Sequence, residues 1–468
     1  CVTSHCIPLG PVKIKERFCS HNNWNMPKSD AKKKRASATP STMEHESKTE
    51  LENVCARTVV EQFYSHLLKD PSSTKHVESV ELITTGWVNR NFIVRLGTVV
   101  GRTRSDMPVP VESDENSTVA HSPASSSSSH ERKYGDNDNN RYVLRCVPRS
   151  NMDGDGDAKG QKREALQFEM QMLNSCLQAS LPVPIPVENV NGELICELDH
   201  STTFSYAVMF RYVEGEHHVN DREEWEVIAI SRFLGDMHRL TSSQLSISSR
   251  QMSWCNRPIP PSKMSGMDVN STRSVLRELL HNGDPNRDDR IVSICQDIAR
   301  YFDMVFTHNV QQWFETCFTS PDNSSSSTMM MEEEELLPCA IIHGDLHDEN
   351  VLFNRKEQRL FCVLDWDECS VGHQISDLAQ AVFLWCFVAS KPHLFSELSQ
   401  LFVREYEVRR GKALSHLERS LLIYCMFYTS VLQCIFLLDD HNVRTSEQSI
   451  LRLQYLNEYL QWMRQEIE

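Results

Sequence analysis

The sequence lacks an excess of basic charge. Its 468 residues contain 48 lysines and arginines against 64 aspartates and glutamates, which gives a formal net charge of -16. Nucleic acids and anionic membranes are bound through clustered Lys and Arg side chains that displace counterions. The composition therefore argues against a dedicated nucleic-acid or membrane-surface binder, and any phosphate site in this chain must be built locally.

Paired cysteines and long apolar runs are also missing. The 16 cysteines include no C-x-x-C pair, and several fall in apolar segments such as 141–147 and 360–365, which is typical of reduced intracellular thiols. No uninterrupted apolar run is long enough to span a bilayer, and no signal peptide opens the chain. We therefore expect a cytoplasmic protein without a membrane span. Because the chain begins with Cys1 rather than Met, nuclear or organellar targeting stays open.

Apolar periodicity divides the chain into a β-rich half followed by a helical half. We expect residues 1–49 to be a disordered extension, 50–213 to form a lobe containing β-strands, and 214–468 to form a mainly helical lobe. Two stretches, 97–140 and 322–336, are rich in Ser, Asn or acidic residues and are predicted to be insertions without a packed core. This order of elements predicts an α+β fold.

The same patterns place individual elements. Strands are predicted near 77–84, 91–96, 141–147, 193–198 and 206–213. Helices are predicted near 56–67, 161–179, 222–242, 287–317, 375–390, 415–439 and 445–466.

The segment from His343 to Asn350, H-G-D-L-H-D-E-N, has the D-x-x-x-x-N spacing of a kinase catalytic loop. Phosphoryl transfer needs a carboxylate that accepts the proton of the attacking hydroxyl, and hard oxygen ligands that hold Mg²⁺ against the phosphates of ATP. Asp345 suits the first task. Asn350 and Asp365, which follows the strand-like residues 361–364, suit the second. The spacing therefore predicts an ATP-dependent phosphotransferase with Asp345 as the catalytic base.

These residues, together with D-W-D at 365–367 and G-H-Q-I-S-D-L-A at 372–379, resemble the aminoglycoside phosphotransferase and choline kinase superfamily. The resemblance covers most of residues 50–468 and is strongest over 341–384. It implies a bilobal, protein-kinase-like fold with a small antiparallel β-sheet N-lobe that binds ATP and a larger, mainly helical C-lobe. It also implies Mg²⁺-dependent phosphorylation of a small-molecule hydroxyl, and we expect an amine on that acceptor because many family substrates carry one. The oligomeric state stays open.

The resemblance extends to the N-terminal half. Gly86 and Asn89 lie in a segment similar to the family's hairpin over the ATP phosphates. Arg145 occupies the position of the ATP-binding Lys, and it would present a planar fork where Lys presents a point charge. The family spacing favours Glu169 as the partner of Arg145, with Glu164 as the alternative.

Two further segments resemble functional parts of the family. Residues 209–215 are similar to the hinge that binds adenine through backbone groups, which implies cofactor contacts at Phe210 and Tyr212. Asp377 of the D-L-A block is expected to orient the catalytic loop. Asp367 has three open interpretations: a second metal contact, an anchor for a substrate amine, or a solvated carboxylate.

Three other functions compete with this interpretation. A protein kinase should carry A-P-E after its metal-binding Asp, and the sequence has none. A metallophosphatase would use the G-D-x-x-D match at 344–348, but its G-N-H-E block is missing and the one upstream D-x-H lies far away in a helical pattern. A pseudokinase or scaffold is suggested by Arg145 and the insertions. It is disfavoured because Asp345, Asn350 and Asp365 are all present.

Overall fold

The structure is a computed structural model. It describes residues 40–70, 73–83, 89–99, 140–149, 156–199, 202–218, 222–248, 269–281, 288–318, 337–388, 394–439 and 447–467. Gly86, nearly all of the predicted insertion 97–140 and the whole of 322–336 lie outside these residues.

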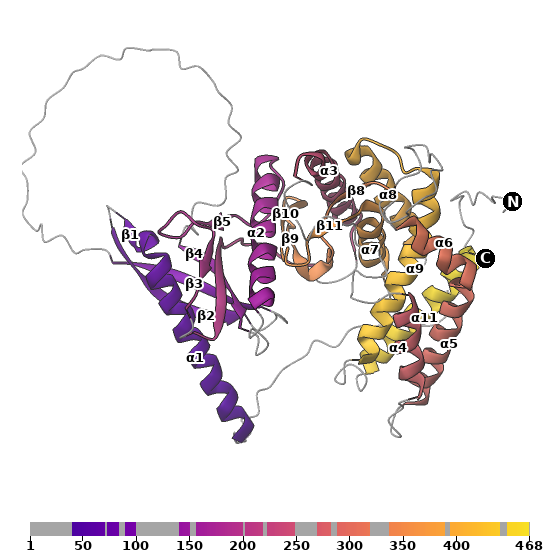
Figure 1. Ribbon diagram of the computed structural model, residues 1–468, viewed down its shortest axis with the longest axis horizontal. Helices are drawn as coiled ribbons and strands as arrows, with labels where there is room; N and C mark the ends of the chain where they lie inside the picture. Colours follow the sequence, from indigo (N-terminus) through magenta and orange to yellow (C-terminus); the bar gives the residue numbers. More distant parts are fainter. Residues whose placement is uncertain are drawn as a thin grey trace, which may run out of the picture. The chain divides into compact units, whose positions relative to one another are not determined.

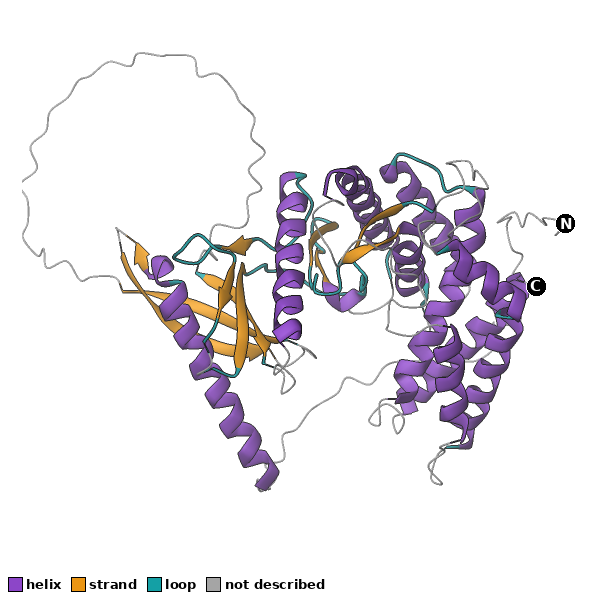
Figure 2. Ribbon diagram, in the orientation of Figure 1, coloured by secondary structure: helices purple, strands orange, loops and turns teal. Residues whose placement is uncertain are grey.

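The described residues form two compact units. One unit, which we call the sheet unit, contains the residues between 40 and 170 and between 185 and 212. The other, the helical unit, contains residues 171–184 and those from 213 to 467. An antiparallel sheet dominates the first unit and helices dominate the second, which confirms the predicted α+β fold (Figure 2).

The sheet unit is built on a seven-stranded antiparallel sheet with strand order β1-β2-β3-β4-β7-β5, and β6 also pairs with β7. The strands are β1 (Lys69–Asp70), β2 (Ser73–Ile83), β3 (Arg90–Val99), β4 (Arg141–Pro148), β5 (Pro186–Val187), β6 (Ile195–Glu197) and β7 (Phe204–Arg211). The helical elements α1 (Pro40–Phe63), η1 (Ser65–Leu68) and α2 (Gly156–Gln178) complete it, and α2 continues into the helical unit (Figure 1).

The core of the sheet unit lies between α1 and one face of the sheet. Alternate residues of β3, namely Phe92, Val94 and Leu96, are buried together, because successive side chains of a strand point to opposite faces. Val59 and Val60 of α1 join the same cluster. Helix α1 begins at Pro40, well before the predicted start of folded sequence. The residues from 40 to 50 have no apolar period that could have indicated a helix, although proline suits a first helical turn.

The helical unit contains α3 (Glu224–Ser248), α4 (Val269–His281), α5 (Asp289–Val305), α6 (His308–Cys317), α7 (Gln374–Cys386), α8 (Phe395–Arg410), α9 (His416–Asp439) and α11 (Glu447–Ile467). Two short two-stranded sheets interrupt the helices. Their elements are β8 (Cys339–Ile342), η5 (Asp348–Asn350), β9 (Val351–Asn354), β10 (Arg359–Val363) and β11 (Ser370–His373).

The single helix predicted for 287–317 is two helices. Helix α5 ends before Phe306, whose ψ of 59° is not helical, and α6 starts at His308. The Phe306 ring is fully buried and contacts the rings of Phe302, Phe314 and Tyr428. Aromatic packing therefore decides the break, because burying a large ring outweighs the weak local preference for a continuous helix.

Helix α9 is the apolar centre of the helical unit. Among the described residues, it contains the one segment, His416–Leu438, that is long and apolar enough to cross a membrane by length and composition. Of its most apolar stretch, 67% is buried inside the protein, against neighbours that include α7 and α11. A helix that is apolar around its whole circumference is also what the centre of a helical bundle requires.

Candidate active site

Two short two-stranded sheets place the predicted catalytic loop, residues 343–350, beside Asp365. Strand β8 pairs with β11 and β9 pairs with β10, both antiparallel, so the loop joining β8 to β9 lies against the turn joining β10 to β11. The Leu364 amide donates to the Asn350 carbonyl at 2.7 Å, and the Leu364 carbonyl is 2.9 Å from His343 Nε2. The structure therefore brings Asp345, Asn350 and Asp365 into one neighbourhood.

Asp377 of α7 holds the start of the loop. Its two carboxylate oxygens accept the backbone amides of His343 and Gly344 at 3.0 and 3.1 Å, so the predicted role in orienting the loop is confirmed. His238 Nε2 lies 3.1 Å from the same carboxylate. Burial by itself would raise the pKa of Asp377, but the hydrogen bond and charge of His238 bring that pKa below its usual value. A buried carboxylate therefore stays ionised beneath the loop.

The backbone conformation at position 344 requires a glycine. Its φ is +83°, a left-handed conformation that other residues rarely adopt. A Cβ atom at this position would lie 2.9 Å from the Glu368 carbonyl oxygen, which belongs to the neighbouring turn. Glycine thus lets the loop approach the turn that carries Asp365.

His343 has a structural place. Its Nε2 faces the Leu364 carbonyl, its Nδ1 accepts the Asp345 amide at 3.3 Å, and its ring lies 4.7 Å from that of Trp366. Complete burial lowers the pKa of this imidazole, which favours the neutral ring that these two bonds require. Both nitrogens have protein partners, so the ring supports the loop and is not placed to bind a metal.

Asp345 presents an ionised and accessible carboxylate. Its Oδ2 lies 3.3 Å from His347 Nε2 and accepts the Asn350 side-chain amide at 3.2 Å. Burial would raise the pKa of Asp345, but these neighbours outweigh burial and lower it. The side chain is 40% exposed, so a substrate can reach it. An anionic oxygen acceptor held by two donors is the arrangement that a general base needs.

Asn350 and Asp365 can supply oxygen ligands to a cation. The Asn350 amide nitrogen donates to the main-chain oxygen of Asp345 at 2.9 Å as well as to its carboxylate, which fixes the amide and leaves its oxygen for another partner. Asp365 has a φ of +55°, a left-handed conformation that Asp tolerates better than most residues. Amide and carboxylate oxygens suit Mg²⁺, which takes few protein ligands and completes its shell with phosphates and water.

Two alternative functions find no support at this site. Within the described ranges, no group of three or more His, Cys, Asp and Glu side chains is arranged to hold a metal by itself, whereas a metallophosphatase or zinc site needs such a group. The chain from Asp365 to α7 consists of a short turn and β11, all of it described. It therefore has no activation segment of the kind that forms a peptide platform in protein kinases.

The remaining predicted residues lie in the sheet unit. Arg145 in the middle of β4 and Glu169 on α2 form a buried ion pair, with side chains 6% and 3% exposed, whereas Glu164 is exposed. The Arg145 guanidinium lies 5.5 Å from the Phe210 ring. The structure thus joins Arg145, Glu169 and Phe210 within one unit, while Asn89 lies just before β3.

Tyr212 follows β7 and uses its backbone amide within the sheet. That amide donates to the Arg141 carbonyl at 3.1 Å, and the Tyr212 ring lies 3.8 Å from the Arg141 guanidinium. Because the amide is already used, a backbone contact from Tyr212 to adenine would be made by its carbonyl oxygen.

The sequence indicated no catalytic role for three residues, one within the predicted catalytic loop and two that contact it. His347 touches Asp345, Arg222 touches Asp348 at 3.3 Å, and Trp385 Nε1 donates to the Leu346 carbonyl at 2.9 Å. His347 could have been found from its place two residues after Asp345. Arg222 and Trp385 come from distant parts of the chain, and no spacing in the sequence indicates them.

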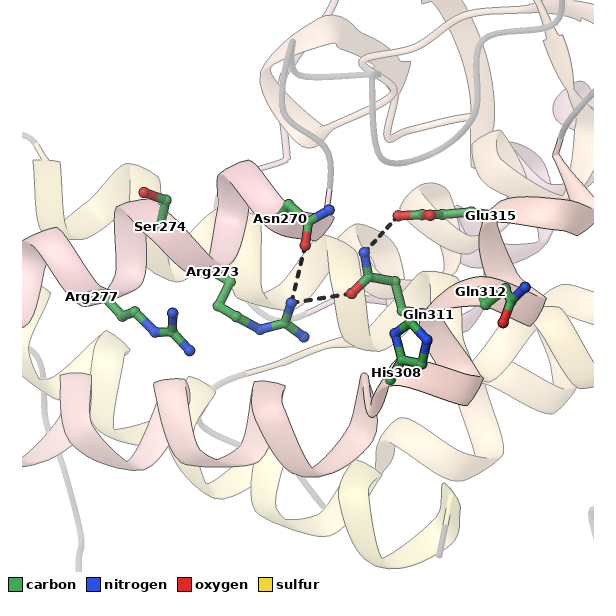
Figure 3. A pocket seen from close by; sticks show the side chains of 8 residues that line it. All are labelled: Asn270, Arg273, Ser274, Arg277, His308, Gln311, Gln312 and Glu315. Carbon is green, nitrogen blue, oxygen red and sulfur yellow. Dashed lines mark hydrogen bonds between the residues drawn. The ribbon is translucent and has the colours of Figure 1, made fainter.

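A second polar region lies between α4 and α6, where a cavity of about 810 Å³ opens (Figure 3). The residues lining it are Asn270, Arg273, Ser274, Arg277, His308, Gln311, Gln312 and Glu315. Arg273 is already bound by Asp303 at 2.7 Å, Gln311 at 3.1 Å and the Phe306 carbonyl at 2.8 Å, which makes it a link between helices. None of the predicted site residues lines this cavity.

Comparisons with known proteins agree with the chemistry of the loop. The model of the phosphotransferase enzyme family matches residues 120–411, more than half of the chain. Human acyl-CoA dehydrogenase family member 11 is 28% identical over 85 residues, 18% of this chain and 10% of that protein. An uncharacterized protein of Synechocystis is 21% identical over 215 residues, which are 46% of this chain and 48% of that protein. This chain thus spans only about a tenth of the human relative and about half of the Synechocystis relative.

Solved structures align with this chain at low identity. A microcompartment-associated aminopropanol kinase aligns with a TM-score of 0.49 and 16% identity, over 85% of this chain and 94% of that one. The choline kinase of Cryptosporidium parvum aligns with a TM-score of 0.43 and 12% identity, over 89% and 95%.

Proposed function

Because this chain belongs to the phosphotransferase enzyme family, we propose that it is a kinase that transfers the γ-phosphate of ATP to a hydroxyl group of a small molecule. The observation that carries the proposal is the state of Asp345. This carboxylate is ionised, accessible, and held by His347 and Asn350 within a loop that lies against the turn bearing Asp365. No other described carboxylate near the loop combines these properties with the spacing of a kinase base.

In the proposed reaction Asp345 orients the acceptor hydroxyl and takes its proton. Its Oδ2 is engaged by His347 and Asn350, so Oδ1 is the oxygen that would face the hydroxyl. The hydroxyl oxygen forms a bond to the γ-phosphorus while the bond between that phosphorus and the bridging oxygen of ADP breaks, and the bond electrons leave with ADP. Asp345 contributes by position and charge, because the transition state of phosphoryl transfer asks little covalent chemistry of the protein.

Asn350 and Asp365 are proposed to hold Mg²⁺ through the amide oxygen and the carboxylate. The ion would neutralise charge on the phosphates when bound. The short bond from the Leu364 amide to the Asn350 carbonyl keeps the two ligand-bearing segments in register, at 2.7 Å. Asp367, two residues beyond Asp365, remains a candidate for a further metal contact or for a substrate anchor.

Arg145 is proposed to bind phosphate oxygens of ATP, with Glu169 fixing the direction of its guanidinium. The ion pair is buried, so the arginine cannot reorient freely, and a planar fork suits phosphate oxygens. Backbone groups at Phe210 and Tyr212 are proposed to bind adenine, and Gly86 and Asn89 to cover the phosphates.

The proposed acceptor is a small alcohol that carries an amine. Supporting this, burial and the negative charges of Asp367 and Asp345 raise the pKa of Glu368, which indicates a high density of acidic groups beside the base. A cationic substituent would be attracted to such a site. The acidic composition and the reduced thiols favour a cytoplasmic location for this reaction.

The proposal is tested by replacing the base. Asp345→Asn keeps the size of the side chain but removes its basicity, so ATP turnover with an accepted alcohol should fall by roughly 10²- to 10⁴-fold. Glu349→Gln is the matched control, because it removes one negative charge from the same loop at an exposed side chain. A panel of amino alcohols, amino acids and sugars identifies the acceptor through ATP consumption. Equal turnover by the wild-type and Asp345→Asn proteins would contradict the assignment.

Nucleotide binding gives an independent test. Mg²⁺-dependent stabilisation by ATP should raise the unfolding temperature of both the wild-type and Asp345→Asn proteins, since the base is not a phosphate ligand. Stabilisation that does not require Mg²⁺, or its complete absence, would argue for a scaffold that has lost catalysis.

A further inference from the structure

Arg222 braces the outer side of the catalytic loop. Its Nη1 donates to Asp348 Oδ2 at 3.3 Å and its Nη2 donates to the Leu384 carbonyl at 3.1 Å. Its guanidinium carbon lies 4.8 Å from the centre of the Trp385 ring. The side chain is only 12% exposed, so the arginine is held in one orientation by a carboxylate, a carbonyl and an aromatic ring.

Asp348 passes this restraint to His347. The Asp348 Oδ1 lies 3.8 Å from His347 Nδ1, while His347 Nε2 lies 3.3 Å from Asp345 Oδ2. The Glu349 amide also points at Nδ1, at 3.2 Å. The imidazole ring is thus fixed on both edges, and one of those edges orients the proposed base.

Residues at both ends of helix α7 contact the catalytic loop. Asp377 in the first turn binds the amides of His343 and Gly344. In the last turn, Trp385 donates to the Leu346 carbonyl at 2.9 Å, while Leu384 accepts from Arg222. Arg222 therefore completes a support in which the main chain of the loop and the side chain of Asp348 are fastened to the same helix.

We propose that Arg222 is a positioning residue for phosphoryl transfer, acting on Asp345 through Asp348 and His347. This inference rests on the proposed function. Asp348 is 39% exposed, so without Arg222 its side chain would be free to rotate into solvent, and the Nδ1 edge of His347 would keep only its contact with the Glu349 amide. A base that is displaced by about 1 Å can lose on the order of 10²-fold in rate, because transfer depends on close alignment of the reacting atoms.

The chain offers a closely matched control for Arg222. Arg273 in α4 also binds one carboxylate, that of Asp303 at 2.7 Å, and one main-chain carbonyl, that of Phe306 at 2.8 Å. Its guanidinium lies 5.8 Å from the Phe302 ring, and its side chain is 19% exposed. Arg273 also binds Gln311, so Arg273→Gln should cost at least as much stability as Arg222→Gln, without touching the catalytic loop.

The experiment compares the two variants in the full chain. Arg222→Gln should lower kcat by roughly 10- to 100-fold while KM for ATP and for the acceptor stays within about twofold. Arg273→Gln should lower the unfolding temperature and leave kcat close to wild type. Arg222→Lys keeps a charge beside Asp348 but has no planar fork, and should recover part of the lost kcat. Equal kcat for Arg222→Gln and wild type, or an equal loss in Arg273→Gln, would overturn the proposal.

A double variant tests the path through Asp348. If Arg222 acts through Asp348, then Arg222→Gln and Asp348→Asn each remove the same restraint, and together they should lower kcat little more than either alone. Multiplicative losses would show that Arg222 acts by another route, and would overturn the proposed path.

Hydrogen exchange separates this inference from the proposed function. Amides of residues 345–349 should exchange faster in Arg222→Gln than in Arg273→Gln, whether or not the chain turns over ATP. A wild-type protein without ATP turnover would refute the proposed function. Unchanged exchange in the loop of Arg222→Gln would refute the positioning role even in an active enzyme.

Discussion

The charged groups proposed to act in the sheet unit and in the helical unit differ in how they are enclosed. In the sheet unit, Arg145 and Glu169 face each other with almost no exposure. In the helical unit, Asp345 and Asp348 are about two-fifths exposed, at 40% and 39%, while His347 and Arg222 contact one oxygen of each. The first pair is buried, whereas the carboxylates of the second group are partly exposed to solvent.

This difference in exposure predicts what the loss of each group should change. A buried ion pair has lost its hydration, so removing one partner leaves an uncompensated charge and costs stability. A base must reach its substrate, so it keeps an open side and depends on hydrogen bonds from the rest of the loop for its direction. We therefore expect the loss of Glu169 to lower stability strongly, and the loss of Asp345 to act mainly on turnover.

The largest effect on stability is expected from removing one partner of the buried ion pair between Arg145 and Glu169. Glu169→Ala leaves the Arg145 guanidinium buried without its carboxylate, which should lower the free energy of unfolding by about 3–5 kcal/mol. Denaturant unfolding of the two proteins measures the difference. Glu164→Ala, at an exposed position on the same helix, is the control and should change stability by less than about 0.5 kcal/mol. Similar losses of stability in Glu169→Ala and Glu164→Ala would mean that the buried ion pair stabilises the protein no more than an exposed glutamate does. The contrast between the two units would then be wrong.

A smaller loss of stability is expected from Asp377→Asn. This variant allows a buried carboxylate to be compared with the exposed Asp345 inside the helical unit. The asparagine can accept only one of the two loop amides through its oxygen, and its nitrogen would face the other amide. An unsatisfied buried donor costs about 1–3 kcal/mol, so both the unfolding free energy and kcat should fall. Asp345→Asn should lower kcat alone. Loss of kcat without loss of stability in Asp377→Asn would place this residue in the reaction rather than beneath the loop.

The sequence was most informative where chemistry depends on short spacing. Asp345, Asn350 and Asp365 lie within the stretch from β8 to β11, so a local motif was enough to bring them together. The link between Arg145 and Glu169 needed the resemblance to a family, because a strand and a helix separate them. Helices α4 and α8 were not predicted, and the break at Phe306 depends on a ring cluster that draws on α5, α6 and α9.

The supports of the loop could not be read from the sequence. Arg222, Trp385 and His238 lie more than 30 residues from the positions that they hold. The packing of α3 and α7 against the strands β8, β10 and β11 brings their parts of the chain to the loop. Tertiary contacts of this kind leave no periodic pattern, and for that reason the candidate base was predictable while its orientation was not.

The smallest expected effect is the pH dependence that His347 adds to stability. Burial opposes its charge, but the hydrogen bonds and charges of Asp345 and Asp348 raise the pKa of His347 to about 10. The unfolded ring titrates near 6.5, so the stabilisation is fully present below about pH 6.5 and is lost as pH rises toward 10. The size should be at most about 1 kcal/mol, since solvent screens both carboxylates. The neutral ring can also accept the Glu349 amide at Nδ1, which offsets part of the loss.

The free energy of unfolding, measured from pH 6 to 10 for the wild-type and His347→Gln proteins, tests whether His347 stabilises the protein more at low pH than at high pH. The wild-type protein should be the more stable at the acid end, and the difference between the two should shrink as pH rises. A difference that grows with pH would mean that His347 is neutral in the folded protein and serves the Glu349 amide alone. In that case Asp345 would owe its low pKa to His343 and Asn350, and fewer charges would hold its exposed carboxylate than we infer.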